Sequence, residues 1–307
     1  MKNEKPYIKE WIEYHKLQGV EHFYLCDNES TDGTKEYLSP YIKSGLITYI
    51  AQPGVNQQQK CYDKIVKTYG KETDWLAIID LDEYLVPLQA QNMREFLKEF
   101  ADVSEVSLHW LNYGNNHLYS RRQGLVTEDF TSHSAKLNHT VKSIVRPDKV
   151  IDFTAFGSNH YVRVTGASVN EYHKPVSSML SFNISADKAR VNHYITKSFT
   201  EFINKKRRGH PEGTPIDYSY YFFHNENEVV GDTTMQRFLP RLKKAMAQSP
   251  LPDILIPQPE GVPAELTDFT FTAAEASRIL KQPISEPMTY HEVAKKYLTK
   301  DYPNYKK

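Results

Sequence analysis

Two aspartates close an apolar stretch of the sequence, and their spacing is compatible with metal binding. The run 75–79 (Trp-Leu-Ala-Ile-Ile) is followed by Asp80, Leu81 and Asp82. Alternate residues of an extended strand point to the same side, so the two carboxylates would project together from the strand end. Hard divalent cations prefer such oxygen ligands. An Asp-x-Asp triplet arises by chance about once in a chain of this composition, so the prediction depends on its place after a buried strand. A solvated acidic turn is the alternative.

Strands and helices alternate through the first hundred residues. The apolar periodicity and the positions of proline and glycine predict helices at 6–18, 35–42, 56–69 and 93–100, and strands at 20–26, 46–50 and 75–80. Shorter β-like runs follow at 106–110, 140–145, 150–153 and 190–194, with a helix at 198–208. This pattern is typical of an α/β sheet, in which ligands bind at the carboxyl ends of the strands.

Composition narrows the classes of partner. The chain has 307 residues, and 38 Lys and Arg balance 38 Asp and Glu, so its formal net charge is zero. No overall field attracts nucleic acid, and we expect no nucleic-acid partner. No apolar run is long enough for a transmembrane segment, and two cysteines, Cys26 and Cys61, argue against a disulfide scaffold. We expect a cytoplasmic protein, with peripheral contact at the inner face of the membrane as a further option.

Several motifs occur in an order that resembles a known family. They are Lys-Asn-Glu at 2–4, Glu-Trp-Ile-Glu-Tyr-His at 10–15, the polar segment 27–34, Ile-Asp-Leu-Asp-Glu-Tyr-Leu at 79–85, Gly-Leu-Val at 124–126, Lys-Ser-Ile-Val-Arg-Pro at 142–147 and Asn-His-Tyr-Ile-Thr-Lys-Ser at 192–198. As a set, over residues 2–235, they resemble glycosyltransferase family 92 and related bacterial family 2-like glycosyltransferases.

The resemblance implies an α/β fold of the GT-A (Rossmann-like) type, with a mixed central sheet flanked by helices. We expect a glycosyltransferase domain at 1–248, with a nucleotide-binding part at about 1–105 and an acceptor-side part at about 106–248. Residues 249–307 would form a C-terminal extension with some helix. Relatives carry an apolar strand directly before the Lys-Asn-Glu element, and this chain begins at that element. We therefore expect an open sheet edge beside the nucleotide pocket.

The implied reaction is metal-dependent transfer of a sugar from a UDP- or GDP-sugar to a glycan or lipid-linked acceptor, with inversion. Asp82, Asp80 and His193 would hold the metal, and the histidine favours Mn²⁺ over Mg²⁺. Five further residues, with Asp80, would bind the nucleotide: Asn3, Glu4, Asp27, Asn28 and, at the diphosphate, Lys197. Helix capping is the alternative role for Asp27, and a structural histidine is the alternative for His193.

Inversion requires a base for the acceptor hydroxyl, and relatives place an acid near Glu128 and Asp129. An ordinary loop acid is the alternative there. Trp110 and His160 are candidates for the acceptor pocket, with core packing as the alternative for Trp110. The basic run 205–208 (Lys-Lys-Arg-Arg) ends a predicted helix, where cations complement the helix dipole. A solvated helix end is the favoured interpretation, and a phosphate or anionic-membrane contact is the functional one.

Two other functional classes deserve comparison. A sugar-1-phosphate nucleotidyltransferase would open with a glycine-rich phosphate loop, but residues 1–20 contain only Gly19. A non-catalytic nucleotide- or carbohydrate-binding protein would share the polar residues of the site and lack turnover. Metal-dependent hydrolysis of nucleotide sugars separates this second class from an enzyme.

Overall fold

The computed structural model describes residues 1–153, 161–211, 213–225, 228–229, 231–256, 265–266 and 269–301. The helices are α1 (Lys5–Leu17), α2 (Thr34–Tyr37), α3 (Ser39–Lys43), α4 (Gln58–Tyr69), α5 (Met93–Phe96), α6 (Val126–Asp129), α7 (Phe199–Arg208), α8 (Tyr218–Asn225), α9 (Leu239–Gln248), α10 (Ala273–Leu280) and α11 (Tyr290–Asp301). Short 3-10 helices are η1 (Gly70–Glu72), η2 (Leu97–Phe100), η3 (Pro147–Lys149) and η5 (Thr234–Arg237).

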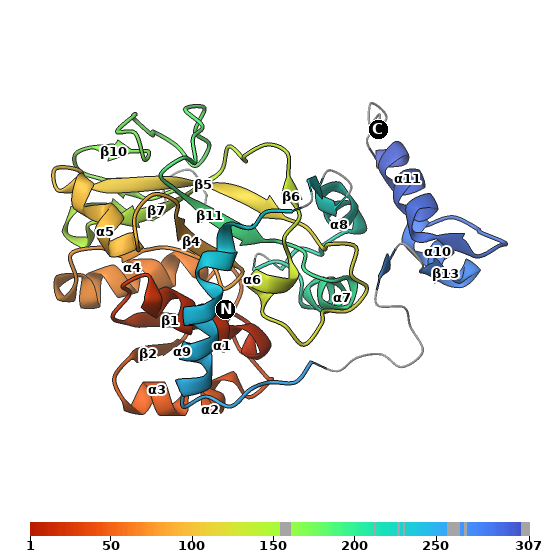
Figure 1. The fold of residues 1–307 in the computed structure, drawn as a ribbon, viewed down its shortest axis with the longest axis horizontal. Helices are drawn as coiled ribbons and strands as arrows, with labels where there is room; N and C mark the ends of the chain where they lie inside the picture. The colour runs from red at the N-terminus through yellow and green to blue at the C-terminus, as the bar shows by residue number, and fades with distance from the viewer. Residues whose placement is uncertain are drawn as a thin grey trace.

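The strands are β1 (Phe23–Asp27), β2 (Ile47–Ala51), β3 (Leu76–Ala77), β4 (Glu83–Pro87), β5 (Glu105–Tyr113), β6 (His133–Ser134), β7 (Val141–Val145), β8 (Val150–Asp152), β9 (Arg163–Val164), β10 (Ser168–Val169), β11 (Ala189–Tyr194), β12 (Glu228–Val229), β13 (Thr270–Phe271) and β14 (Met288–Thr289). They alternate with helices through the first hundred residues, as predicted. Helices flank a mixed sheet (Figure 1), which confirms the α/β class.

The main sheet has eight strands among the described residues. Its path runs β12-β6-β5-β11-β4, while β10 and β7 also pair with β5, and β3 pairs with β7. The long strand β5 is buried along its whole length and pairs in parallel with β11 and antiparallel with β7. Strand β11 also pairs antiparallel with β4, so that His193 lies opposite Glu83. This pairing brings the histidine close to the two aspartates before β4.

The strand expected at 75–80 is shorter than the apolar pattern suggests. Only Leu76 and Ala77 are paired, and the partner, β7, runs antiparallel. An apolar run indicates burial but not the direction of the neighbouring strand, and an antiparallel neighbour is compatible with the mixed sheet that was expected.

Strand β1 pairs in parallel with β2 in a separate two-stranded sheet. On its other edge the amino group of Met1 donates to the carbonyl of Cys26 at 2.7 Å, and the amide of Asn28 donates to the carbonyl of Met1 at 2.8 Å. Within the described strands, β1 therefore has one strand neighbour. The open edge expected beside the nucleotide pocket stays a prediction.

Local sequence signals explain most helix boundaries. Pro6 lies in the first turn of α1, where its missing N–H costs no hydrogen bond. The Asn92 side chain accepts from the amide of Glu95 at 2.9 Å and caps α5. Ser198 and Glu201 form a capping box at the start of α7. The single helix expected at 35–42 is divided into α2 and α3, with Pro40 in the first turn of α3.

Two apolar clusters organise the chain. The larger one joins α1, β1, β2 and α9, and it includes Leu251 beyond the predicted boundary at 248. The second joins α7 and α8 with α10 and α11, which lie together at one side of the molecule in Figure 1. None of the helices in the described part of the chain has both the length and the apolar character needed to cross a membrane.

Cys26 of β1 and Cys61 of α4 form a disulfide, with 6.3 Å between their Cα atoms. The sequence analysis did not anticipate this bond, because two cysteines 35 residues apart carry no pairing signal. Structural disulfides persist in oxidising compartments. The bond therefore counts against the expected cytoplasmic location.

Candidate functional site

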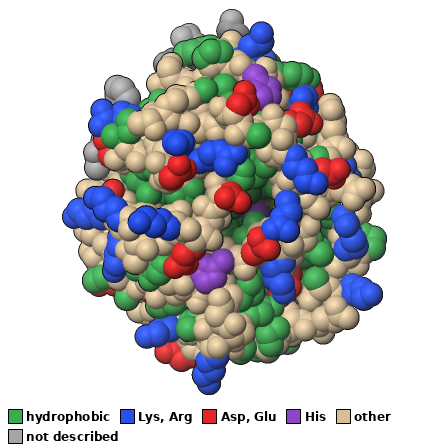
Figure 2. Space-filling view, turned by 90° about the vertical axis from the view of Figure 1, so that its left-hand side faces the viewer, with side chains coloured by type: hydrophobic (Ala, Val, Ile, Leu, Met, Phe, Trp, Pro, Cys, Tyr) green, Lys and Arg blue, Asp and Glu red, His purple; other side chains and the backbone are tan. Residues whose placement is uncertain are grey.

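A cavity of about 1600 Å³ opens beside the ends of β1 and β3 and extends to α7. Its charged lining residues include Glu4, Asp80, Asp82, Lys205 and Arg208, while residues such as Leu25 and Ile78 supply an apolar wall. Figure 2 shows a hollow with hydrophobic side chains inside and acidic and basic side chains around its rim. Acidic and basic groups from segments far apart in the sequence thus face one space.

Asp82 lies in the turn between β3 and β4, and its side chain is 14% exposed. Its Oδ2 accepts a hydrogen bond from Lys205 Nζ at 2.9 Å, and its Oδ1 lies 3.7 Å from His193 Nε2. Burial raises the pKa of Asp82, but Lys205 and His193 outweigh burial and hold the pKa well below its ordinary value. The carboxylate is therefore ionised at neutral pH and can bind a cation.

His193 reaches Asp82 through the pairing of β11 with β4. The amide of Tyr194 donates to the carbonyl of Asp82 at 2.8 Å, which fixes the histidine beside the turn. Burial lowers the pKa of His193, so its imidazole is neutral, as a metal ligand must be. Its buried Nδ1 has no hydrogen-bond partner within the described part of the chain.

Asp82 and His193 are compatible with a divalent cation as a carboxylate and imidazole pair. Among the described residues, no group of three or more His, Cys, Asp or Glu side chains is arranged to hold a metal ion. A cation here would take its remaining ligands from water and from the oxygens of a bound substrate, as Mg²⁺ commonly does.

Asp80 is held by two partners from distant segments. Its Oδ1 accepts from Gln58 Nε2 at 3.0 Å and its Oδ2 accepts from Lys142 Nζ at 2.7 Å. Lys142 is 1% exposed and also lies 3.2 Å from Glu83 Oε2. Burial lowers the pKa of Lys142, but Asp80 and Glu83 outweigh burial and raise it, so the ammonium stays charged. Asp80 is thus anchored to the protein on both oxygens.

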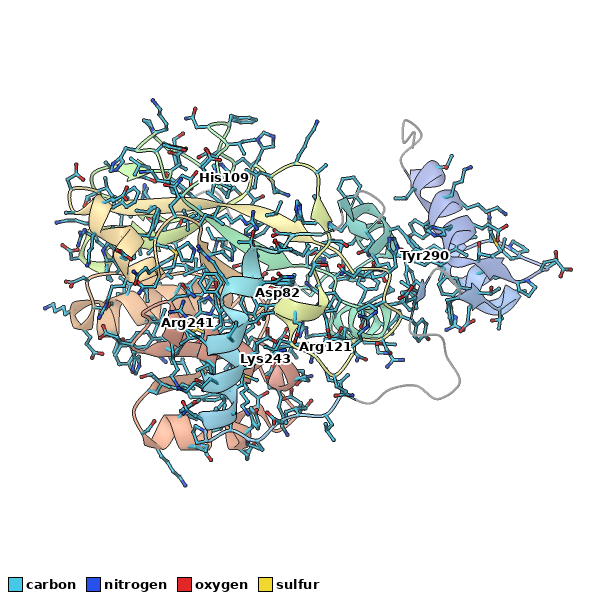
Figure 3. The ribbon with its side chains drawn as sticks, in the orientation of Figure 1. Asp82, His109, Arg121, Arg241, Lys243 and Tyr290 are labelled. Carbon is cyan, nitrogen blue, oxygen red and sulfur yellow. A yellow bond between two sulfur atoms is a disulfide. The ribbon has the colours of Figure 1, made fainter. Side chains whose placement is uncertain are left out.

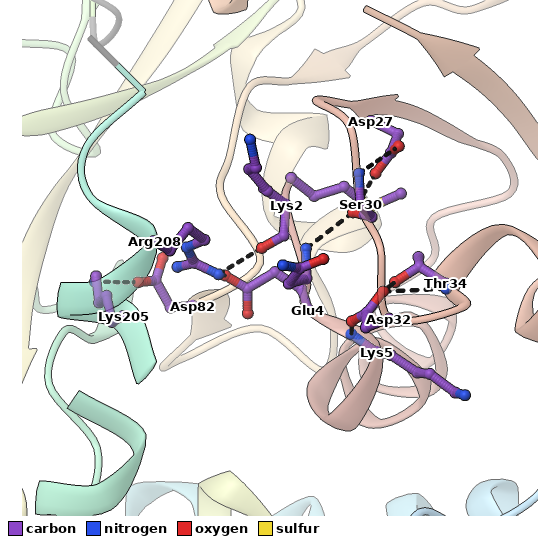
Figure 4. A network of polar contacts seen from close by, with 12 residues as sticks. Lys2, Glu4, Lys5, Asp27, Ser30, Asp32, Thr34, Asp82, Lys205 and Arg208 are labelled. Carbon is purple, nitrogen blue, oxygen red and sulfur yellow. Dashed lines mark hydrogen bonds and ion pairs between the residues drawn. The ribbon is translucent and has the colours of Figure 1, made fainter. Parts of the chain in front are cut away.

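Two of the nucleotide candidates near the N-terminus, Glu4 and Asp27, take part in the polar contacts drawn in Figure 4. Asn3 Oδ1 accepts from the amide of Thr31 at 2.7 Å, and Asp27 Oδ2 accepts from the amide of Ser30 at 3.1 Å. Asp27 does not cap α2, whose N-cap is Gly33. Asn28 Nδ2 donates to the carbonyls of Gln52 and Gly54 at 2.9 and 2.7 Å.

Of these candidates, only Glu4 and Asn28 line the cavity. Asn3 and Asp27 lie behind it and shape the loop 27–34. Nucleotide binding by these four candidates stays a prediction. The hydrogen bonds of Asn3 and Asp27 show a structural role for these two residues.

Lys197 is buried and adopts a left-handed backbone conformation, with φ of 55°. Its Nζ lies 4.5 Å from the centre of the Tyr7 ring. Burial lowers its pKa, although Asp82 and Glu4 oppose this. The residue does not line the cavity, so its contact with a diphosphate also stays a prediction.

Glu128 and Asp129 lie on α6, away from the cavity lining. Glu128 forms a half-exposed ion pair with Lys243, which projects from α9 (Figure 3). Burial raises the pKa of Asp129, whose Oδ2 has no hydrogen-bond partner within the described residues. The structure does not bring either acid to Asp82. Their catalytic role stays a prediction.

Trp110 and His160 are the two candidates for the acceptor pocket. Trp110 lines the cavity on β5, with its ring centre 4.3 Å from that of His193. His160 lies outside the described residues.

Known proteins that are similar to this chain belong to one family. A sequence model of glycosyltransferase family 92 matches residues 2–244. The chain belongs to glycosyltransferase family 92. A family 92 protein from Oryza sativa subsp. japonica is 24% identical over 209 residues, covering 67% of this chain and 34% of the relative. Another from Ricinus communis is 26% identical over 216 residues, covering 66% and 35%. The chain spans about a third of the length of these curated relatives.

The cavity of the family 92 chain is also lined by two basic residues that were not predicted to be part of the site. Lys205 and Arg208 line the cavity, so the favoured interpretation of the basic run as a solvated helix end is wrong for both. Phe199 and Phe202 are buried, and Lys205 follows one turn later on the same side of α7. The spacing of these three residues along the helix was the feature of the sequence that could have identified Lys205. Gln58 and Lys142 offered no comparable signal, because their contact with Asp80 depends on the tertiary fold.

Proposed function

We propose that this chain transfers a sugar from a UDP- or GDP-sugar donor to a hydroxyl group of a glycan or lipid-linked acceptor. The supporting observation is the ionised carboxylate of Asp82 beside the neutral imidazole of His193, facing a cavity that Lys205 and Arg208 also line. A diphosphate needs both a cation and basic side chains, and this arrangement offers places for each. Membership of family 92 supports the same reaction class.

Asp82 and His193 would hold a Mn²⁺ or Mg²⁺ ion, and the imidazole favours Mn²⁺. When bound, the ion stabilises the negative charge that develops on the leaving diphosphate. Asp80 accepts hydrogen bonds from Gln58 and Lys142 on its two oxygens, so we place it near the ribose or in contact with the ion through water. Asn28 and Glu4 lie where they can contact the nucleotide, and Lys197 would add positive charge nearby.

We propose inversion at the sugar, with Glu128 or Asp129 taking the proton from the acceptor hydroxyl. A base must come within hydrogen-bond reach of that hydroxyl. Neither acid lines the cavity, so this role requires a movement of α6 on acceptor binding. Glu128→Gln and Asp129→Asn test it, because loss of transfer with unchanged donor binding would identify the base.

The decisive experiment measures release of nucleoside diphosphate from a panel of UDP- and GDP-sugars, with Mn²⁺ and with a chelator. A family 92 transferase releases the diphosphate only with the ion, and His193→Ala should weaken Mn²⁺ activation at least about tenfold. A non-catalytic binding protein would show a raised melting temperature with donor and no release. Release of pyrophosphate from a nucleoside triphosphate and a sugar phosphate would identify a nucleotidyltransferase instead.

A further inference from the structure

The four basic residues at the end of α7 divide between two environments. Lys205 and Arg208 line the cavity, where Lys205 Nζ contacts Asp82 and also donates to the carbonyl of Ile195 at 2.8 Å. Lys206 instead donates to the carbonyl of Ile216 at 2.8 Å, and Arg207 is exposed. Residues three apart on a helix share a face, which explains why the first and fourth members of the run point together.

Lys205 is placed where it competes with a metal ion. Its ammonium lies 2.9 Å from Asp82 Oδ2, the carboxylate oxygen nearest to it. A cation that coordinates Asp82 repels the nearby ammonium, so binding of the ion favours movement of the lysine away from this carboxylate. The lysine side chain is 17% exposed and long, so its charged end can move within the cavity.

Arg208 holds a second acidic residue of the same cavity. Its guanidinium pairs with Glu4 and donates from Nη1 to the carbonyl of Lys2 at 2.6 Å (Figure 4). The guanidinium fork carries five N–H donors, more than these contacts use, and its geometry matches phosphate oxygens. Lys205 and Arg208 thus bring two positive charges to one wall of the cavity.

We propose that Lys205 and Arg208 bind the diphosphate of the donor, and that Lys205 exchanges partners during loading. Before loading, Lys205 neutralises Asp82. When a divalent ion takes the carboxylate, the ammonium moves to a phosphate oxygen of the nucleoside diphosphate. Arg208 binds the same diphosphate without competing for the ion. This proposal rests on the proposed function, and it assigns to two named residues the charge that receives the phosphates.

The test compares four single variants of the full chain: Lys205→Met, Arg208→Met, and the matched controls Lys206→Met and Arg207→Met. Calorimetry measures binding of Mn²⁺ alone, and then of UDP, GDP and inorganic pyrophosphate in the presence of Mn²⁺. Lys205→Met should bind Mn²⁺ alone at least about threefold more tightly and the diphosphates about tenfold more weakly. Arg208→Met should weaken the diphosphates by a similar factor with unchanged Mn²⁺ affinity. The two controls should match the wild type.

In Lys205→Met the affinity for Mn²⁺ should rise while the affinity for diphosphates falls. These opposite changes distinguish exchange of partners from misfolding, because a misfolded variant would lose affinity for both ligands. Lys205→Arg should recover most of the diphosphate affinity, and melting temperatures check folding. Equal diphosphate affinity in all four variants would overturn the assignment of Lys205 and Arg208 to the diphosphate, while leaving the proposed function intact. Unchanged, weakened or undetectable Mn²⁺ binding in Lys205→Met would overturn the exchange. Failure of the wild type to bind any of the three diphosphates would contradict the proposed function itself.

Discussion

Asp80 and Asp82 are one residue apart and each contacts a lysine, but the two pairs are held differently. Lys142 comes from β7, is 1% exposed, and lies between Asp80 and the buried Glu83. Lys205 comes from the end of α7, is 17% exposed and faces the cavity. Lys142 is thus enclosed by the sheet, whereas Lys205 faces the space where a ligand would bind. Both aspartates line that space, with 36% of the Asp80 side chain and 14% of the Asp82 side chain exposed.

This difference separates a fixed lysine from one that can move. A buried charge that loses its partner is left in a medium that stabilises it poorly, so the contacts of the buried Lys142 with Asp80 and Glu83 must stay intact. Lys205 can leave Asp82, because its charged end faces the cavity. Two aspartates one residue apart thus have lysine partners that differ in their freedom to move.

The largest effect should follow Asp82→Asn. The amide keeps the shape of the side chain but removes the charge that would hold the ion, so turnover should fall by about a thousandfold or more. Release of nucleoside diphosphate from the donor used by the wild type measures this. The melting temperature should change little, since the side chain faces the cavity. Near-normal turnover would show that the Asp82 carboxylate does not hold an ion needed for the reaction.

Lys142→Met should destabilise the fold by about 3–5 kcal/mol, because it leaves Asp80 and Glu83 together without a cation. Lys205→Met should cost less, because the Asp82 carboxylate that it leaves faces the cavity, where water can solvate it. Urea unfolding compares the two. Burial raises the pKa of Glu83 to about 8, so the cost of Lys142→Met should be larger at pH 9 than at pH 6, where Glu83 holds a proton. Equal costs for the two lysines would remove the proposed distinction.

The disulfide between Cys26 and Cys61 supports the Asp80 side of the comparison. It joins β1 to α4, and α4 also carries Gln58, which donates to Asp80. Reduction, or Cys26→Ser with Cys61→Ser, should lower the free energy of unfolding by about 2–4 kcal/mol. Unfolding with and without reductant measures the loss, and the double variant should no longer respond to reductant. A wild type that is indifferent to reductant would show that the bond does not stabilise the fold.

His15 should make a smaller, pH-dependent contribution to stability through its contact with β4, the strand that follows both aspartates. Its Nδ1 donates to the carbonyl of Trp11 at 2.8 Å, and its Nε2 accepts from the amide of Leu85 on β4 at 3.3 Å. Burial lowers the pKa of His15 from 6.5 to about 3. The neutral form is therefore favoured in the folded state, and this stability is present above pH 6.5 and lost as the pH falls toward 3.

The His15 contribution should amount to about 2 kcal/mol between pH 8 and pH 5. Urea unfolding at these two values measures it, with His15→Gln as the comparison that removes this titration. A variant with the same pH dependence as the wild type would assign the effect to other groups.

Local sequence patterns determined much of the fold. Helix α1 follows from Pro6, an apolar face and the stop near Gly19, and α5 follows from the Asn92 cap, because capping and periodicity act within a few residues. The sequence also placed Asp80 and Asp82 after an apolar strand, but β3 ends at Ala77 and both acids lie in the segment between β3 and β4. Resemblance to family 92 added His193, which spacing alone would not have selected.

Tertiary structure decided which polar residues meet. Lys205 reaches Asp82 across 123 positions of the chain, Lys142 reaches Asp80 across 62, and Cys61 pairs with Cys26 across 35. No local pattern encodes such contacts, because they depend on how sheets and helices pack. The sequence by itself specified the elements and the acids that follow an apolar run. Only the packed fold showed that the lysine beside Asp80 is enclosed and that the lysine beside Asp82 faces the cavity, since burial and charge pairing are properties of the folded chain.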